Sequence, residues 1–321
     1  MSGAARHKEA NSCNSLYGKD LLDIRDLDKD QIKFLMRRAD TMLGALNSSK
    51  RLDPLKNMIL GKLFFEESTR TRQSFEIAIQ KLGGGYTGFN SDKETSVMKG
   101  ESLADTIKVM SLMYADVLVL RHPDEGAGRE AATHSDVPVI NAGDGVGQHP
   151  TQALLDLFTL RMEKGRMKDL NIAIVGDLAN GRTVHSLAYA LALFNNNMTF
   201  IAPPELQLPR RIISDLKNNY SISTQKTSSI EAALDVDVIY MTRIQRERFK
   251  KPEDYARFAS SYTIDEDFMS KAREGTIVMH PGPRLTEISP KIDSLPGSVY
   301  FRQASYGVPV RMAILKSLLV K

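Results

Sequence analysis

The chain has 321 residues, of which 42% are hydrophobic, so it can bury a large core, and its length favours two compact lobes. It has no run of about 18 apolar residues and no apolar N-terminal signal core, which argues against a membrane span and secretion. The small formal charge of +4 argues against a nucleic-acid groove, and the single Cys13 excludes an intrachain disulfide or a thiolate metal site. We expect a cytoplasmic protein with no metal, cofactor, membrane or nucleic-acid partner.

Short apolar runs alternate with helical patterns along the chain. Residues 1–17 predict a flexible leader, and a helical pattern begins at Asp28. The runs that fit buried strands are 59–65, 117–120, 137–140, 172–175, 238–241 and 277–279. This alternation predicts βαβ units and parallel sheets. A helix over 151–164 separates the runs into two groups, and an apolar helix over about 308–320 closes the chain.

The fold class expected from this order is α/β, with two parallel-sheet αβα lobes and the active site in the cleft between them. We place a first substrate domain at 18–150 and a second at 151–300. The C-terminal helix, 301–321, is expected to pack back on the first lobe.

A cluster of anion-binding side chains follows the strand predicted at 59–65. The run is Ser68-Thr69-Arg70-Thr71-Arg72. It begins a predicted helix, whose free N–H groups and dipole attract anions, so it predicts a phosphate site without a glycine-rich loop. The simpler alternative is that Ser68 caps the helix and the arginines are solvated, but five such residues in a row favour the phosphate site.

Polar groups also follow the next two strands. Arg121 follows the strand at 117–120, and the glycine-rich loop 141–152 ends with His149 and Gln152. Such a loop can bring backbone close to a ligand. Structural roles are expected for four other histidines, which are His122, His134, His185 and His280.

Arginines follow the strands of the second half. The segment 176–182 lacks the G-x-G-x-x-G spacing, so a nicotinamide cofactor is excluded, and it ends at Arg182. Arg243 follows the strand at 238–241, whereas Arg246 is expected on a solvated face. Because guanidinium forks suit carboxylates, the second lobe is predicted to bind a carboxylate and the first a phosphate.

These segments resemble those of the aspartate carbamoyltransferase family, over almost the whole chain from 18 to 320. The similar segments, in family order, are 64–72, 141–145, 149–152, 181–187 and 241–245. The resemblance implies transfer of the carbamoyl group of carbamoyl phosphate to the α-amine of L-aspartate, in de novo pyrimidine biosynthesis. No covalent intermediate or metal is needed, since carbamoyl phosphate is already activated.

The resemblance also implies residue roles. Phosphate is held by Ser68, Thr69, Arg70 and Thr71, while Thr71, Arg121 and His149 polarise the carbonyl. The carbamoyl amide is oriented by Gln152 and by the backbone carbonyl of Gly282. Aspartate is bound by Arg182, Arg243 and Gln245. Glu66 pairs across the lobes with Arg182 and Arg248 on closure.

A shared active site is a further implication. Ser96 and Lys99 reach a neighbouring subunit, which makes the catalytic unit a homotrimer. Three settings fit the sequence equally: a chain that acts alone, one that binds regulatory chains, and a piece of a larger pyrimidine-pathway polypeptide.

Two segments depart from the family pattern. Gly282 stands where a larger apolar residue is usual and is expected to loosen its turn, with a modest effect on affinity. The segment 303–307 also differs and is interpreted as packing.

Two other functions compete with this interpretation. Ornithine carbamoyltransferase shares this type of phosphate site, but its His-Cys-Leu-Pro segment is replaced here by residues 280–283 without cysteine, and Arg243 with Gln245 suits a carboxylate. A non-catalytic trimeric scaffold would lose its site residues, yet every position assigned to the site has a chemically competent side chain.

Overall fold

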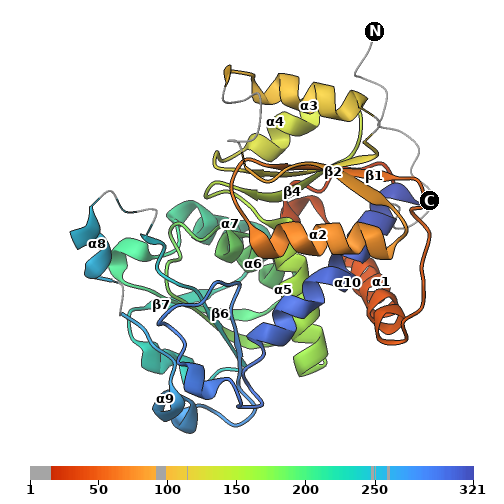
Figure 1. Ribbon diagram of the computed structural model, residues 1–321. Coiled ribbons are helices and arrows are strands. Elements are labelled where there is room, and N and C mark those ends of the chain that lie inside the picture. The colour runs from red at the N-terminus through yellow and green to blue at the C-terminus, as the bar shows by residue number, and fades with distance from the viewer. Residues whose placement is uncertain (1–15, 92–98, 114, 247–248, 250, 259–260) are drawn as a thin grey trace.

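In the computed structural model the chain forms two α/β lobes joined by long helices (Figure 1). The structure describes residues 16–91, 99–113, 115–246, 249, 251–258 and 261–321. In this part of the chain no helix is long and apolar enough to cross a bilayer. Of the predicted leader, only its end is described, and there Leu16 is buried in the core rather than flexible.

The first lobe contains a four-stranded parallel sheet in the order β2-β1-β3-β4. Its strands are β1 (Ile59–Phe64), β2 (Gly85–Phe89), β3 (Val117–His122) and β4 (Val139–Asp144). Its helices are α1 (Lys29–Asn47), α2 (Thr69–Lys81), α3 (Leu103–Leu112) and α4 (Ala127–His134). α3 and α4 cover one face of the sheet, and α1 and α2 lie on the other (Figure 1).

The second lobe contains a five-stranded parallel sheet in the order β7-β6-β5-β8-β9. Its strands are β5 (Asn171–Val175), β6 (Asn197–Ile201), β7 (Thr224–Thr227), β8 (Val238–Met241) and β9 (Ile277–Met279). Its helices are α6 (Arg182–Leu193), α7 (Arg210–Tyr220), α8 (Pro252–Ala256) and α9 (Glu266–Lys271). The prediction of two parallel-sheet lobes is confirmed, although β2, β6 and β7 were not predicted.

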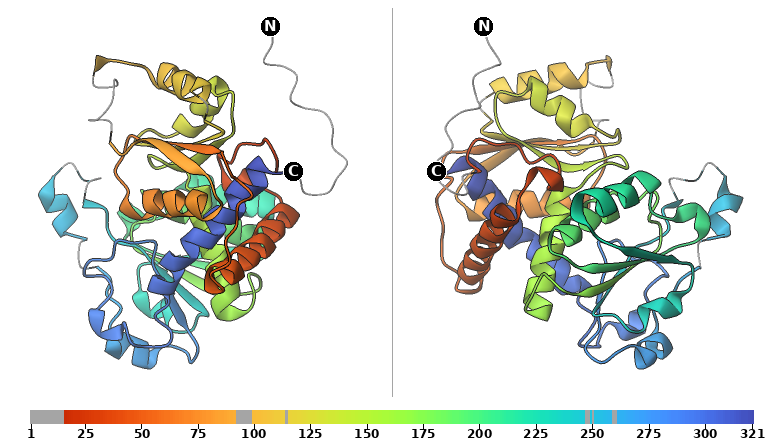
Figure 2. Two further views of the ribbon diagram at one scale, coloured as in Figure 1. Left: turned by 45° about the vertical axis from the view of Figure 1, so that its right-hand side comes forward. Right: turned by 180° about the vertical axis from the view of Figure 1, so that it is seen from behind.

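Two helices connect the lobes. α5 (Pro150–Lys164) runs between the sheets, and its residues from Pro150 to Leu160 are all buried. α10 (Tyr300–Leu319) starts beside the second lobe and passes α5, α2 and α1 toward the first (Figure 2). The backbone N–H of Gly18 donates to the carbonyl of Leu318, which holds the end of α10 on the first lobe. α10 begins one residue before the predicted C-terminal helix, 301–321, and eight before the apolar pattern at about 308–320.

Local signals explain where α1 and α5 begin. Asp28 caps α1 as predicted, and its carboxylate accepts from the N–H groups of Asp30 and Gln31. α5 begins with Pro150 at its first position, where the missing N–H is not needed. Apolar side chains from both lobes pack on α5 and form one continuous core. The carboxyl ends of both sheets are therefore held at fixed positions around the start of α5.

Candidate active site

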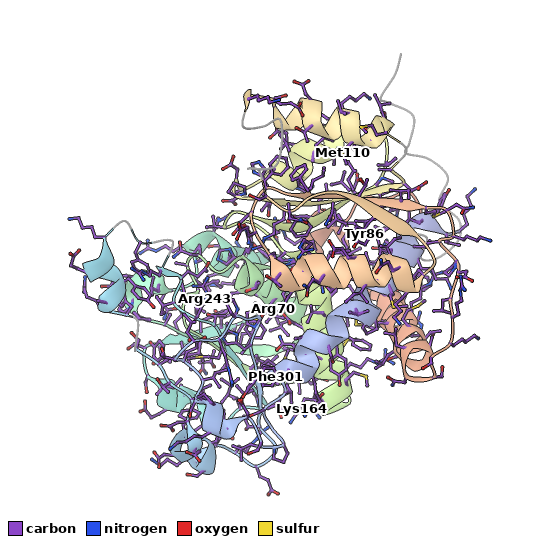
Figure 3. The ribbon with its side chains drawn as sticks, in the orientation of Figure 1. Arg70, Tyr86, Met110, Lys164, Arg243 and Phe301 are labelled. Carbon is purple, nitrogen blue, oxygen red and sulfur yellow. The ribbon has the colours of Figure 1, made fainter. Side chains whose placement is uncertain are left out.

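A cavity of about 520 Å³ lies between the lobes, at the carboxyl ends of their strands. The first lobe lines it with the segment after β1, with Arg121 and with the start of α5. The second lobe contributes the start of α6, the segment after β8 and the turn after β9. Figure 3 shows Arg70 at the end of α2 that faces the second lobe, with Arg243 approaching from that lobe. The cavity is where the sequence predicted it.

The start of α2 forms the first wall. Ser68 stands at the N-cap position, yet its side chain makes no capping hydrogen bond, so the simple capping interpretation is wrong. Ser68, Thr69, Arg70 and Thr71 all line the cavity. Arg72 does not, because its guanidinium forms an ion pair with Glu76 at 2.9 Å, one turn along the helix. The prediction of an anion-binding run therefore applies to its first four residues.

Glu66 joins arginines of both lobes. Its Oε1 lies 3.4 Å from Nη2 of Arg121, and its Oε2 lies 2.9 Å from Nη2 of Arg182. Arg182 also donates to the carbonyl of Gly145 at 3.0 Å, and Arg121 donates to the carbonyl of Ala142 at 3.3 Å. These contacts hold two guanidinium groups side by side at the back of the cavity.

Gly143 makes room for this pair of arginines. Its φ is +118°, and a Cβ atom there would lie 2.9 Å from Nε of Arg182 and 3.2 Å from Nη1 of Arg121. The glycine-rich loop was predicted to bring backbone close to a ligand. In the structure its close approach is to the arginines that face the cavity.

His149 is buried near these arginines. Burial, with Arg121, Arg182 and Arg311 nearby, lowers the pKa of His149 well below its usual value of 6.5. Its backbone N–H donates to the hydroxyl of Ser186, 2.8 Å away, which ties the start of α5 to α6. The imidazole is therefore neutral near pH 7 and can donate a hydrogen bond without carrying charge.

The second-lobe wall carries Arg182, Arg243 and Gln245. Burial and the charge of Arg243 both lower the pKa of Arg70, which indicates that positive charge from the two lobes converges on one space. In the described residues no carboxylate lies within ion-pair distance of Arg70. This concentration of guanidinium groups suits a ligand with several negative charges.

The turn after β9 closes the cavity. Gly282 has φ +71°, and a Cβ atom on it would lie 2.8 Å from Cζ of Arg70. Its N–H donates to Nδ1 of His280, whose Nε2 lies 2.8 Å from Glu287. His280 thus has the structural role expected, but it also lines the cavity.

The remaining predicted residues lie elsewhere. Ser96 and Arg248 are outside the described residues. Lys99 is exposed and does not line the cavity of its own chain. The described residues contain no group of three or more His, Cys, Asp or Glu that could hold a metal ion.

Two family models cover nearly all of this architecture. Residues 19–162 match the carbamoyl-phosphate-binding domain of aspartate/ornithine carbamoyltransferases, and residues 168–318 match the Asp/Orn-binding domain of the same proteins. The chain belongs to the aspartate/ornithine carbamoyltransferase family. The resemblance seen in the sequence is confirmed.

Individual carbamoyltransferases agree with this assignment. The aspartate carbamoyltransferase catalytic subunit of Methanothermobacter thermautotrophicus is 50% identical over 302 residues, which are 94% of this chain and 96% of that protein. The catalytic subunit of M. jannaschii aspartate transcarbamoylase is 49% identical, with a TM-score of 0.85 over 94% of this chain and 97% of that one. Trypanosoma cruzi aspartate transcarbamoylase in complex with carbamoyl phosphate and aspartate is 39% identical, with a TM-score of 0.90 over 95% and 98%.

Three polar residues of this carbamoyltransferase site were missed in the sequence. Gln303 and Arg311 come from α10 and line the cavity, although the segment 303–307 was interpreted as packing. Asp156 is fully buried behind them on α5. The available signal was a charged or amide side chain at an otherwise apolar helical position, which in a core needs a polar partner.

Proposed function

We propose that this carbamoyltransferase transfers the carbamoyl group of carbamoyl phosphate to the α-amine of L-aspartate. The observation that carries the proposal is the convergence of Arg70 and Arg121 from the first lobe with Arg182 and Arg243 from the second on one cavity. Four guanidinium groups match the charge of a phosphate together with two carboxylates. Residues 18–150 would bind carbamoyl phosphate and 151–300 aspartate.

The phosphate is assigned to the start of α2. Ser68, Thr69, Arg70 and Thr71 offer hydroxyl, backbone and guanidinium donors where the helix dipole is positive. Ser68 makes no capping bond, so its side chain is not held toward the helix N–H groups, and its O–H can donate to a phosphate oxygen. Ser96 and Lys99 of a neighbouring subunit are assigned to the same substrate, and Lys99 also to aspartate, and the catalytic unit is proposed to be a homotrimer.

The reaction follows from the donors around the carbonyl group. The neutral amine of aspartate attacks the carbonyl carbon and forms a tetrahedral oxyanion, toward which Thr71, Arg121 and His149 direct their hydrogen bonds. The bond between the carbonyl carbon and the bridging oxygen then breaks, and phosphate leaves with the amine's proton. Orientation alone can supply about 7–11 kcal/mol of the barrier.

Gln152 and the backbone carbonyl of Gly282 are assigned to the carbamoyl NH₂ group. Both residues line the cavity, and both come from segments held by hydrogen bonds within the protein. Two acceptors on this side would fix the plane of the carbamoyl group. The carbonyl oxygen would then face Arg121 and His149.

Aspartate is favoured over ornithine by the charge of the second wall. Arg182, Arg243 and Gln245 can bind the two carboxylates of aspartate. An ornithine ammonium group would face the same guanidinium groups and be repelled. The carboxylate of Glu66 also lines the cavity, but its oxygens are paired with Arg121 and Arg182. It is therefore a poor partner for an ornithine ammonium group.

We further propose that Glu66 and Arg182, joined by Arg248, hold the lobes closed over both substrates. The pairing of Glu66 with Arg182 at 2.9 Å supports this role. A cytoplasmic location is proposed on the single cysteine of the chain, which fits a reducing compartment. De novo pyrimidine biosynthesis is the pathway that consumes the product.

The test is phosphate release from carbamoyl phosphate with L-aspartate and, separately, with L-ornithine. Wild type should release phosphate only with aspartate. Arg70→Ala should lose the activity by about 100-fold or more, since it removes a charged hydrogen-bond donor. Lys81→Ala, at the exposed far end of the same helix, should keep it.

Release with ornithine alone would assign the chain to the sister activity. Absence of release with either amino acid, from a folded protein, would support the scaffold alternative. Equal activity of Arg70→Ala and wild type would reject the phosphate site at α2.

A further inference from the structure

Asp156 is a carboxylate at the centre of the molecule that the proposed reaction does not use. It lies on α5 with 0% exposure and accepts three side-chain hydrogen bonds. Oδ1 accepts from Nε2 of Gln152 at 2.9 Å and from Nε2 of Gln303 at 2.7 Å. Oδ2 accepts from the hydroxyl of Tyr240 on β8 at 2.8 Å. The carboxylate thus connects α5, α10 and the second sheet.

The Oδ1 atom decides which way two amide groups point. A carboxyl oxygen that carries no proton only accepts hydrogen bonds, and Oδ1 receives both amides, so Gln152 and Gln303 must both turn their NH₂ groups toward it. The carbonyl oxygen of each amide must then point away from Asp156. Because Gln152 lines the cavity, its Oε1 is the amide atom available to accept a hydrogen bond from a ligand there.

The second amide acts on the turn after β9. Oε1 of Gln303 accepts from the backbone N–H of His280 at 2.8 Å, which anchors the start of residues 280–283. Pro281 and Pro283 have no N–H, and they line the cavity together with Gly282. This turn therefore presents mainly hydrogen-bond acceptors. Asp156 fixes it through Gln303 without touching it.

We propose that Asp156 is a positioning residue that makes this cavity selective for a carbamoyl group over an acetyl group. The inference rests on the proposed function. A carbamoyl NH₂ donates two hydrogen bonds, whereas an acetyl CH₃ of similar size donates none. Acceptors held rigidly by Asp156 stay unpaired beside a methyl group, and unpaired buried acceptors cost binding free energy.

The two oxygens of Asp156 have separable roles. Oδ1 orients the amides, while Oδ2 and Tyr240 only anchor the carboxylate to the second sheet. Asparagine at position 156 can keep its oxygen toward both glutamines, because the hydroxyl of Tyr240 can accept from the new NH₂ group. Leucine, of similar size, provides no acceptor.

The experiment compares carbamoyl phosphate as substrate with acetyl phosphate as a competitive inhibitor, in the full chain with L-aspartate. For each variant the ratio of the acetyl phosphate Ki to the carbamoyl phosphate KM measures the selectivity. Asp156→Leu should raise the KM by about 30-fold and change the Ki less than about 3-fold. Asp156→Asn should keep the wild-type ratio within about 5-fold.

Tyr240→Phe is the matched control, because it removes one hydrogen bond from the same carboxylate but on the other oxygen. It should lower the melting temperature and leave the ratio unchanged. If Asp156→Leu does not fold, Gln303→Met removes the hydrogen bond between Gln303 and the backbone N–H of His280. This variant should lower the ratio of Ki to KM about 10-fold.

An unchanged ratio in Asp156→Leu, or in Gln303→Met where it replaces that variant, would overturn the inference. A parallel rise of KM and Ki would do so too, since it would indicate a general structural defect. Failure of the proposed function is distinguishable, because the wild type itself would then release no phosphate with L-aspartate.

Discussion

The carboxylate of Glu66 lies 2.9 Å from the guanidinium of Arg182, and these two residues come from different lobes. A second contact joins Glu66 to Arg121, 3.4 Å away. The Glu66 side chain is 34% exposed and the Arg182 side chain 11%. The pair is thus neither a solvated surface contact nor a fully buried one, and its loss should be measurable.

Glu66→Gln should raise the KM for L-aspartate by about 10-fold, which corresponds to about 1.4 kcal/mol. The amide keeps the shape of Glu66 but loses the charge that holds Arg182 against the first lobe. Steady-state kinetics with saturating carbamoyl phosphate measures the change. Glu274→Gln, at an exposed position, is the charge-matched control. An unaltered KM in Glu66→Gln would show that the pair does not contribute to aspartate binding.

The sequence led us to expect that Gly282 loosens its turn, so that a larger residue would improve binding, but the structure points the other way. Gly282→Leu should raise the KM for carbamoyl phosphate about 3- to 10-fold, because its Cβ would meet the guanidinium of Arg70 at 2.8 Å. The left-handed φ of +71° adds a backbone cost of about 1–2 kcal/mol. Gly275→Leu separates the two effects, since Gly275 has φ +80° and a Cβ atom there would meet nothing within 4 Å. Equal Michaelis constants in the two variants would rule out the contact with Arg70.

His149 should make the protein less stable in mild acid. The folded protein holds this imidazole neutral, with its pKa well below 6.5, whereas the unfolded chain takes up a proton near 6.5. Stability is therefore full above pH 6.5 and falls as the pH drops below it. The melting temperature of wild type should fall faster than that of His149→Gln between pH 7 and 5. Parallel curves in this window would contradict the burial of a neutral imidazole; above pH 7.5 parallel curves are expected.

The contribution of Asp156 to stability should depend on pH in the opposite sense to that of His149. Burial raises the pKa of Asp156 from 3.8 to about 7, although hydrogen bonds from Gln303, Tyr240 and Gln152 oppose the shift. A raised folded-state pKa gives stability that is present below pH 3.8 and lost as the pH rises through 7. Wild type should thus lose stability relative to Asp156→Asn between about pH 4 and 7, by a few kcal/mol. Denaturant titrations at several pH values measure the difference, and a constant difference would refute the shift.

The parts of the fold that were predicted carry strong local signals. Strands β1, β3, β4, β5, β8 and β9 are rich in apolar residues, although Lys62 interrupts β1 and Asn141 interrupts β4, and such strands are typical of parallel sheets buried on both faces. β2 and β7 lie at sheet edges and are largely exposed, so they lack this apolar pattern. β6 was missed because its apolar residues are too few between polar ones. Strand order could not be read locally, since it depends on contacts between distant segments.

The chemistry of the site was readable for a similar reason. Hydroxyl and guanidinium groups after a buried strand, as at Ser68 and Arg70, indicate anion binding wherever the strand lies. The family resemblance then identified the two substrates. These features depend only on residue type and on sequence order, and both can be read directly from the sequence.

Only the tertiary structure decided which polar residues serve the cavity. In the folded protein the guanidinium of Arg72 pairs with Glu76 instead of lining the cavity. Gln303 contacts Asp156, although the two residues are 147 positions apart in the chain. The sequence determined the kinds of groups available, their local elements and the family. Packing decided their partners and their burial, because α5 and α10 bring residues together that no sequence spacing relates.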